Sequence, residues 1–194
     1  YMVKVQTTLQ LLTKESSDPR ELLIRLNRYL YGQLKKSYFL TVALVQIYPE
    51  GRFSYCRAGH TVAILYEHQK GAFVRLQPHG AALGITPSDG ESGGTAEEQG
   101  AASQPTRPYG DTLDVHSASL EPGDVMLLFT DGVIDTVNTS QQEFGEHRVM
   151  DVLMKHHGSS AESIKAALVE AMASFRDVAE LRDDTTFVIL KRTT

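Results

Sequence analysis

The sequence has one cysteine, no tryptophan and no long hydrophobic run. Cys56 cannot form an internal disulfide or by itself make a zinc cluster, which is typical of a protein of a reducing cytosol and predicts a cytoplasmic location. The longest obvious apolar run, residues 125–129, has the length of a strand, whereas a helix that spans a bilayer needs about 20 apolar residues. We therefore expect no direct contact with a membrane.

An excess of basic charge is also absent. The chain carries 19 Lys and Arg against 24 Asp and Glu, a net charge of -5. Because nucleic-acid-binding domains usually present a basic patch, we expect no nucleic acid as the main partner. The hydrophobic fraction of 41% and charged fraction of 22% are typical of a globular protein. A chain of 194 residues can bury one good core, so we predict a single domain over residues 1–194.

Helical spacing of apolar residues appears first over residues 2–12. A second helix is predicted to start with Asp18 as its cap and Pro19 at its first position, and Glu21 completes a capping-box pattern. The apolar stripe that follows, over 22–34, favours a helix that covers a sheet over one that forms a homodimer contact. Similar patterns predict helices over 146–157 and 160–176.

The strand patterns lie between these helices. Residues 39–48 and 53–57 flank the turn signal Pro49-Glu50-Gly51, and 62–66 and 72–76 form a second predicted hairpin. An antiparallel meander is the simplest interpretation of these four segments. Further strands are predicted at 113–115, 125–130 and 185–190, the last two of a buried type. Together they predict an α+β fold, a layered sandwich of antiparallel β-sheets flanked by helices.

Residues 86–110 consist mainly of Gly, Ser, Glu, Gln, Pro and Thr. Such a segment buries too little apolar surface to offset the entropy of ordering it. We expect a flexible insertion here, and a functional lid is the less favoured alternative.

Acidic residues lie at the ends of two apolar strands. Asp131 directly follows the strand over 125–130, and Asp183 and Asp184 directly precede the strand over 185–190. If the strands are antiparallel neighbours, the carboxylates of Asp131 and Asp183 converge at one sheet edge, where they could bind Mg²⁺ or Mn²⁺. On composition alone, however, an Asp-Gly turn and a solvated strand start are the favoured interpretation.

Six sequence segments carry a family resemblance, and they occur in the family's order over nearly the whole chain. They are Phe39-Leu40-Thr41 (F-x-T), Ala58-Gly59-His60 (A-G-H), Gly80 with Ala82-Leu83-Gly84-Ile85 (G-x-P-L-G-I), Leu120-Glu121-Pro122-Gly123-Asp124 with Thr130-Asp131-Gly132-Val133-Ile134-Asp135 (L-x-P-G-D…Y-T-D-G-x-x-E), Phe144-Gly145-Glu146-His147-Arg148-Val149 (F-G-x-x-R-L) and Asp183-Asp184-Thr185-Thr186 (D-D-x-T). The chain resembles the bacterial SpoIIE/RsbU branch of the metal-dependent serine/threonine phosphatases, which have the protein phosphatase 2C fold.

The resemblance implies hydrolysis of phosphoserine or phosphothreonine on a regulatory protein, such as an anti-sigma-factor antagonist in a bacterial partner-switching pathway. Two Mn²⁺ or Mg²⁺ ions would bridge a water molecule, lower its pKa and hold the phosphoryl oxygens during in-line attack. By motif match, Asp131 and Asp183 would be metal ligands. Asp184, the neighbouring position, would lie outside the direct ligands of the metal, and a shift of the motif by one residue would exchange its role with that of Asp183. Gly132 would allow a tight chain reversal beside the ion.

The chain also departs from the family pattern. The family supplies further metal ligands from a G-G-D-x-x-D strand and a G-D-x-x-G-H-G segment, and neither motif occurs here. The helix near Tyr1 resembles the one that follows G-D-x-x-G-H-G. We therefore expect that the N-terminal strands of the domain are missing and that the chain alone is inactive, because two aspartates cannot hold a two-metal cluster.

Other polar residues have alternative interpretations. His60, in the A-G-H segment, could contact the metal site or donate to phosphate, and a purely structural role at a strand end is at least as consistent with the pattern. Cys56 is predicted to be a sheet residue, because a cysteine phosphatase needs an Arg six positions further on and position 62 is Val62. Glu121 and Asp124 are expected to be solvated turn acids.

Two functional alternatives to the enzyme remain. The first is a non-catalytic pseudo-phosphatase that binds the same partner, and the second is a sensor or scaffold domain whose acids only form turns. The residues that precede Tyr1 in the full protein would discriminate among them.

Overall fold

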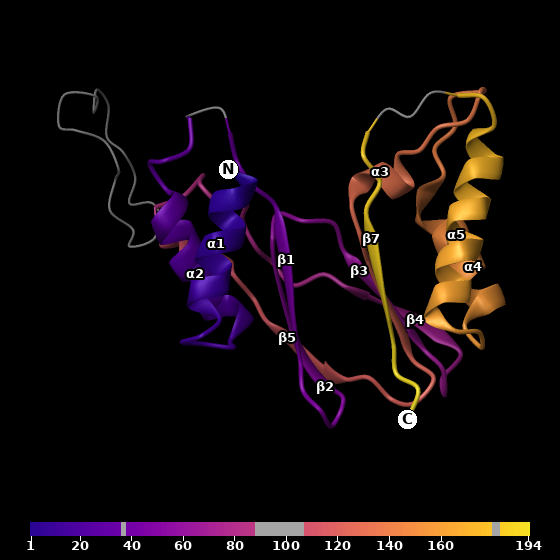
Figure 1. Ribbon diagram of the computed structural model, residues 1–194, viewed down its shortest axis with the longest axis horizontal. Coiled ribbons are helices and arrows are strands. Elements are labelled where there is room, and N and C mark those ends of the chain that lie inside the picture. The colour runs from indigo at the N-terminus through magenta and orange to yellow at the C-terminus, as the bar shows by residue number, and fades with distance from the viewer. Residues whose placement is uncertain (36–37, 88–106, 180–182) are drawn as a thin grey trace. The chain divides into compact units, whose positions relative to one another are not determined.

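The computed structural model describes residues 1–35, 38–87, 107–179 and 183–194 (Figure 1). The chain divides into two compact units. Unit 1 comprises Tyr1–His60 and Pro78–Ala118, and unit 2 comprises Thr61–Gln77 and Ser119–Thr194. Each unit has its own antiparallel sheet, its own flanking helices and its own buried cluster, so the predicted α+β class is confirmed. The single domain over 1–194 stays a prediction.

Unit 1 contains a three-stranded sheet in the order β1-β2-β5. Its elements are α1 (Met2–Leu12), α2 (Pro19–Leu30), β1 (Val42–Ile47), β2 (Arg52–Ala58), the 3-10 helix η1 (Tyr109–Thr112) and β5 (His116–Ser119). The predicted hairpin is confirmed, with β1 and β2 antiparallel and Val42 opposite Ala58. The strand predicted at 113–115 instead begins at His116, because Leu113 is held at the end of η1 and is buried in the core.

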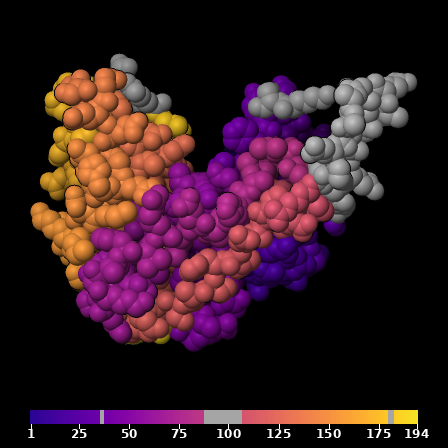
Figure 2. Space-filling view, turned by 180° about the vertical axis from the view of Figure 1, so that it is seen from behind, coloured from indigo at the N-terminus to yellow at the C-terminus, as the bar shows by residue number. Residues whose placement is uncertain are grey.

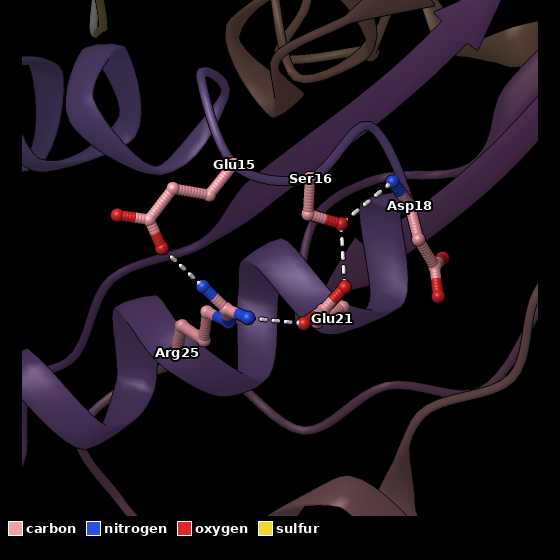
Figure 3. A network of polar contacts seen from close by, with 5 residues as sticks. All are labelled: Glu15, Ser16, Asp18, Glu21 and Arg25. Carbon is pink, nitrogen blue, oxygen red and sulfur yellow. Dashed lines mark hydrogen bonds and ion pairs between the residues drawn. The ribbon is translucent and has the colours of Figure 1, made fainter.

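The start of α2 shows how a polar network replaces the predicted capping box (Figure 3). Asp18 caps the helix as predicted, by accepting the Arg20 N–H at 3.0 Å. Glu21 does not reach back to the Asp18 N–H, which instead donates to the Ser16 hydroxyl oxygen at 3.2 Å. The Ser16 hydroxyl in turn donates to Glu21 at 2.5 Å, and this bond, followed by Arg25, lowers the pKa of the Glu21 carboxyl. Ser16 therefore connects the Asp18 N–H and the Glu21 carboxylate, which a capping box would join directly.

The apolar stripe of α2 covers the sheet, as predicted. Leu23, Leu26 and Leu30 are buried in one cluster with Cys56 and Ala58 of β2. The helix ends at Leu30, four residues before the stripe does. The polar residue Asn27, which is fully buried, lies on the same helix. Its amide nitrogen donates to the Thr86 carbonyl at 2.9 Å, and its amide oxygen accepts the Gly84 N–H at 2.8 Å, so one side chain holds the 84–86 loop on α2.

Unit 2 contains a four-stranded sheet in the order β4-β3-β6-β7, and all its strand pairs are antiparallel. Its elements are β3 (Ala63–Glu67), β4 (Ala72–Leu76), β6 (Val125–Phe129), α3 (Asp131–Ile134), α4 (Gly145–His156), α5 (Ala161–Arg176) and β7 (Phe187–Lys191). Apolar side chains of α4 and α5, among them Leu153 and Leu168, pack in one cluster with the sheet residues Ile64 and Leu127. In Figure 2 the orange atoms of this helical region adjoin the purple and magenta atoms of the β3–β4 hairpin.

Two predictions about the strands need correction. The two hairpins form no single meander, because the chain leaves the first sheet at Gly59, which has φ +66°, and β3 pairs with β6 instead. The last strand is not fully buried, since β7 is a sheet edge and Val188 is 51% exposed. Most of the predicted insertion, 88–106, lies outside the described residues, but Tyr109 at its end is fully buried in the unit 1 core.

Within the described parts of the chain, each helix falls short of the length and hydrophobicity that a membrane crossing requires.

We predict that Asn27→Ala lowers the free energy of unfolding by about 2–4 kcal/mol, because it leaves the partly buried Gly84 N–H and Thr86 carbonyl without their partner. Urea unfolding followed by circular dichroism measures the change. Gln10→Ala, at an exposed position of α1, is the control and should change the stability by less than about 0.5 kcal/mol. An equal effect of both substitutions would contradict the role of Asn27.

Candidate functional site

The pairing of β6 with β7 brings the two acidic segments together. The ladder ends with Phe129 opposite Phe187. It continues beyond the strands, since the Thr130 N–H donates to the Thr186 carbonyl at 2.9 Å and the Thr186 N–H donates to the Thr130 hydroxyl oxygen at 3.1 Å. The exit of β6 therefore adjoins the entrance of β7, and the predicted antiparallel pairing is confirmed.

Gly132 allows the two segments to touch. It is buried, and a Cβ built on it would lie 2.4 Å from the Asp184 carbonyl oxygen, far inside van der Waals contact. The Thr185 hydroxyl also donates to the Gly132 carbonyl at 3.4 Å. The close approach of backbone to backbone is a physical reason for glycine at this position, and it differs from the chain reversal predicted from the sequence. Asp131 in fact begins a short helix, α3, which the sequence pattern did not reveal.

One local hydrogen bond positions each of the two leading carboxylates. Asp131 Oδ1 accepts the Gly132 N–H at 3.0 Å, and Asp183 Oδ1 accepts the Asp184 N–H at 2.7 Å. Both side chains are exposed to solvent. Such bonds restrict the carboxylate orientation without burying it, so ligands can still approach from solvent.

The acids of this region repel one another. Asp135, four residues after Asp131, has its carboxyl pKa raised first by partial burial and then by the negative charges of Asp131, Glu143 and Asp183. Crowded carboxylates of this kind favour the binding of a cation that offsets their charge.

The donor set fits a hard divalent cation in part. Mg²⁺ and Mn²⁺ prefer carboxylate oxygens and retain several water molecules, and Asp131 and Asp183 offer such oxygens at adjoining strand ends. Among the residues that the structure describes, no group of three or more His, Cys, Asp or Glu side chains is arranged to hold a metal ion. Asp131 and Asp183 therefore make a partial site, and their role as ligands stays a prediction, as does that of Asp184 and Gly132.

A cavity of about 600 Å³ adjoins the second acidic segment. Asp183, Asp184 and Thr185 form one part of its lining, and the side of α5 that carries Val169 and Arg176 forms another. Arg176 is also tied to the chain after its own helix, because Nη1 donates to the Ala179 carbonyl at 2.7 Å. The sequence pattern did not predict this wall of the site. The only signal for Arg176 was a basic residue in the last turn of a helix.

His60, Arg57 and Arg148 have local roles in the structure. His60 belongs to unit 1, where its Nδ1 lies 3.3 Å from the Thr41 hydroxyl oxygen. The Arg57 guanidinium donates to the carbonyls of Pro78 and His60, and Arg148 donates to the carbonyls of Glu143 and Phe144. Both arginines therefore donate to nearby backbone carbonyls. A role of His60 toward metal or phosphate stays a prediction.

Two further residues were assigned turn or sheet roles from the sequence. Asp124 is only 3% exposed, so its description as a solvated acid is wrong. Its carboxylate instead accepts the N–H groups of His68 and Glu121, both at 2.8 Å, which stabilise the charge inside the turn. Cys56 is a fully buried residue of β2, as predicted, and burial raises the pKa of its thiol to about 11.

Comparison with known proteins identifies the family. The family model for stage II sporulation protein E (SpoIIE) matches residues 1–193. The chain belongs to the SpoIIE family. Within this family it is similar to the phosphoserine phosphatase RsbU of Bacillus subtilis (strain 168), with 24% identity over 193 residues, which cover 98% of this chain and 50% of RsbU. The SpoIIE-family chain thus spans about half the length of this relative.

Solved structures show the same fold. The SiaA-PP2C domain of Pseudomonas aeruginosa superposes with a TM-score of 0.72 at 18% identity, covering 96% of this chain and 66% of that one. The phosphatase domain of SpoIIE from Bacillus subtilis, presoaked with Mn, superposes with a TM-score of 0.55 at 13% identity, covering 97% and 73%. The SpoIIE-family chain therefore shares the architecture of these phosphatase domains.

We predict that Gly132→Ala lowers the free energy of unfolding by about 1–3 kcal/mol, because the new methyl group forces the Asp184 backbone away. Thermal unfolding measures the loss. Gly158→Ala is the matched control, since a Cβ there meets nothing within 4 Å. If Gly132→Ala were as stable as Gly158→Ala, the close packing of the two acidic segments would be wrong.

We also predict that the Cys56 thiol reacts with an aromatic disulfide reagent at pH 8 at least ~100-fold more slowly in the native protein than in urea. With a pKa of about 11, only about one thiol in a thousand is ionised at that pH, and burial blocks access. Absorbance of the released thiolate measures both rates. Equal rates would show that β2 does not bury this side chain.

Proposed function

We propose that this chain is part of a metal-dependent phosphatase domain that hydrolyses phosphoserine or phosphothreonine on a regulatory protein. The observation that carries the proposal is the β6–β7 register, which sets Asp131-Gly132 against Asp183-Asp184 in a chain matched by the SpoIIE family model over 1–193. The similarity to RsbU, a phosphoserine phosphatase, and to a solved phosphatase domain supports the reaction class.

Asp131 and Asp183 are the proposed metal ligands. In each, a backbone N–H fixes one carboxylate oxygen and so orients the group toward solvent. A bound Mn²⁺ or Mg²⁺ would supply the Lewis acid that lowers the pKa of a water molecule and offsets phosphoryl charge. Asp184 extends the negative field, and Gly132 keeps the two strand ends in contact. The protein's contribution is thus positioning and charge, with no covalent intermediate on a side chain.

The surroundings of the acids suit a macromolecular substrate. Asp131 and Asp183 are exposed, so a phosphorylated side chain on the surface of another protein can reach them. The adjoining cavity offers apolar area at Val169 and a cation at Arg176 for residues next to the phosphate. The proposed partner is a phosphorylated regulatory protein, such as an anti-sigma-factor antagonist, in the cytoplasm.

We further infer that residues 1–194 have little activity alone. Two carboxylates make a partial donor set, and a two-metal phosphatase site needs more protein ligands than that. A homodimer, the less favoured interpretation of the apolar stripe on α2, stays a hypothesis.

Asp131→Asn and Asp183→Asn, each made in the full-length protein, are predicted to lower Mn²⁺-dependent kcat at least ~100-fold, because an amide is a neutral and weaker ligand for a hard cation. Phosphate release from a phosphoserine peptide measures the loss, and EDTA should abolish the wild-type activity.

Asp151→Asn, an exposed acid on α4, is the matched control and should retain full activity. Normal turnover by Asp131→Asn would remove this residue from the site. A wild-type protein that binds the phosphopeptide but releases no phosphate with either metal would favour the pseudo-phosphatase alternative.

A further inference from the structure

A second polar cavity lies at the other end of the β6–β7 pair. α3 and the acidic segments adjoin one end of these strands, and the C-terminus of the chain lies at the opposite end (Figure 1). There a cavity of about 390 Å³ is lined by His68, His157, Lys191 and Arg192, together with the residues at the start of α5. No acidic side chain belongs to its described lining.

Within the described residues, neither cation of this cavity forms an ion pair with an Asp or Glu side chain, and Arg192 Nε donates to the Thr194 carbonyl at 3.0 Å. Lys191 Nζ donates to the carbonyls of His157 at 2.5 Å and Ser159 at 2.6 Å, and Arg192 Nη1 donates to the Leu120 carbonyl at 2.5 Å. Carbonyl oxygens orient an ammonium or guanidinium group, but they carry no formal charge. Two fixed positive charges are thus held beside the cavity.

The imidazole rings add hydrogen-bonding groups. The His68 and His157 rings lie 5.3 Å apart, and the His157 ring packs on Tyr66 at 4.6 Å. His157 Nδ1 is shielded from solvent and has no hydrogen-bond partner among the described residues. Burial, then His68 and then Lys191 lower the pKa of His157. An anion beside these rings would favour their protonated, donating form.

The first turn of α5 completes the wall. Ser160 caps the helix by accepting the Ser163 N–H at 3.1 Å, and α5 is 16 residues long, so its N-terminal dipole adds positive potential. Two carboxylates lie close in sequence to the lining, Asp124 beside Gly123 and Glu162 in the first turn of α5. Asp124 accepts the N–H groups of His68 and Glu121, so its oxygens have hydrogen-bond partners while its charge remains, and Glu162 pairs with Lys165 at 2.6 Å.

We propose that this cavity binds an oxyanion of the phosphate class, either free phosphate or a small phosphate monoester. Lys and Arg are the side chains that suit phosphate oxygens, and both would repel a metal ion that two histidines could otherwise attract. The volume is at the lower end of small-molecule pockets and leaves room for an organic group beside the phosphate. The proposal does not depend on the phosphatase reaction, because Asp131 and Asp183 adjoin the opposite end of the strands.

The test is a titration of the full-length protein with selectively labelled histidines, followed by NMR in EDTA at pH 7. EDTA removes any contribution of divalent metal at the acidic site. Inorganic phosphate, and in a second arm O-phosphoserine, should produce saturable shifts of the His68 and His157 signals, whereas sodium chloride at the same ionic strength should not. A lower Kd for O-phosphoserine would identify a monoester site, and an equal or higher Kd would identify a free-phosphate site.

Two variants probe the lining. Arg192→Gln removes one cation, and His157→Phe retains a ring against Tyr66 while it removes both nitrogens. Each should weaken binding at least ~10-fold, as the loss of a charge-assisted contact does. His147→Phe, at an exposed position of α4, should bind like the wild type. Shifts that sodium chloride reproduces, or wild-type affinity in both lining variants, would overturn the proposal.

Discussion

The contact on which the site depends is the backbone approach of Gly132 to Asp184. It follows from the β6–β7 ladder, which extends beyond its last strand pair through the Thr130 and Thr186 hydrogen bonds. Because a side chain at 132 would collide with the Asp184 carbonyl, the exit of one strand can meet the entrance of the other only at a glycine. The β6–β7 pairing brings the two acidic segments to the same end of the strands, and the absence of a Cβ at Gly132 lets their backbones touch.

This contact has an electrostatic consequence. It places several carboxylates in one region, where the pKa of Asp135 rises in response to burial and to its acidic neighbours. A fold tolerates such crowding at low cost when the groups are exposed, and a cation relieves it. At the far end of the same strands the charges have the opposite sign, since Lys191 and Arg192 lie on a cavity without a described acid in its lining. One strand pair thus adjoins the acidic segments at one end and a cavity lined by two cations at the other.

Local chemistry that depends on a few neighbouring residues was readable from the sequence. Asp18 caps α2, and the apolar run before Asp131 forms a buried strand. The errors arose where more than one partner was open to a residue or strand. Glu21 meets the Ser16 hydroxyl rather than the Asp18 N–H, and β3 leaves the first hairpin to pair with β6. Alternation of apolar residues gives the face of a strand, but it does not name the neighbouring strand.

The sequence by itself determined the α+β class, the family motifs and the acidic residues at two strand ends, because each depends on residue type and short spacing. Only the tertiary structure decided that Asp131 and Asp183 adjoin the same strand pair, that α5 walls the cavity beside them, and that His68, His157, Lys191 and Arg192 line a second cavity. The physical reason is chain distance. Residues far apart in the sequence meet only when sheet pairing and helix packing fix their relative places.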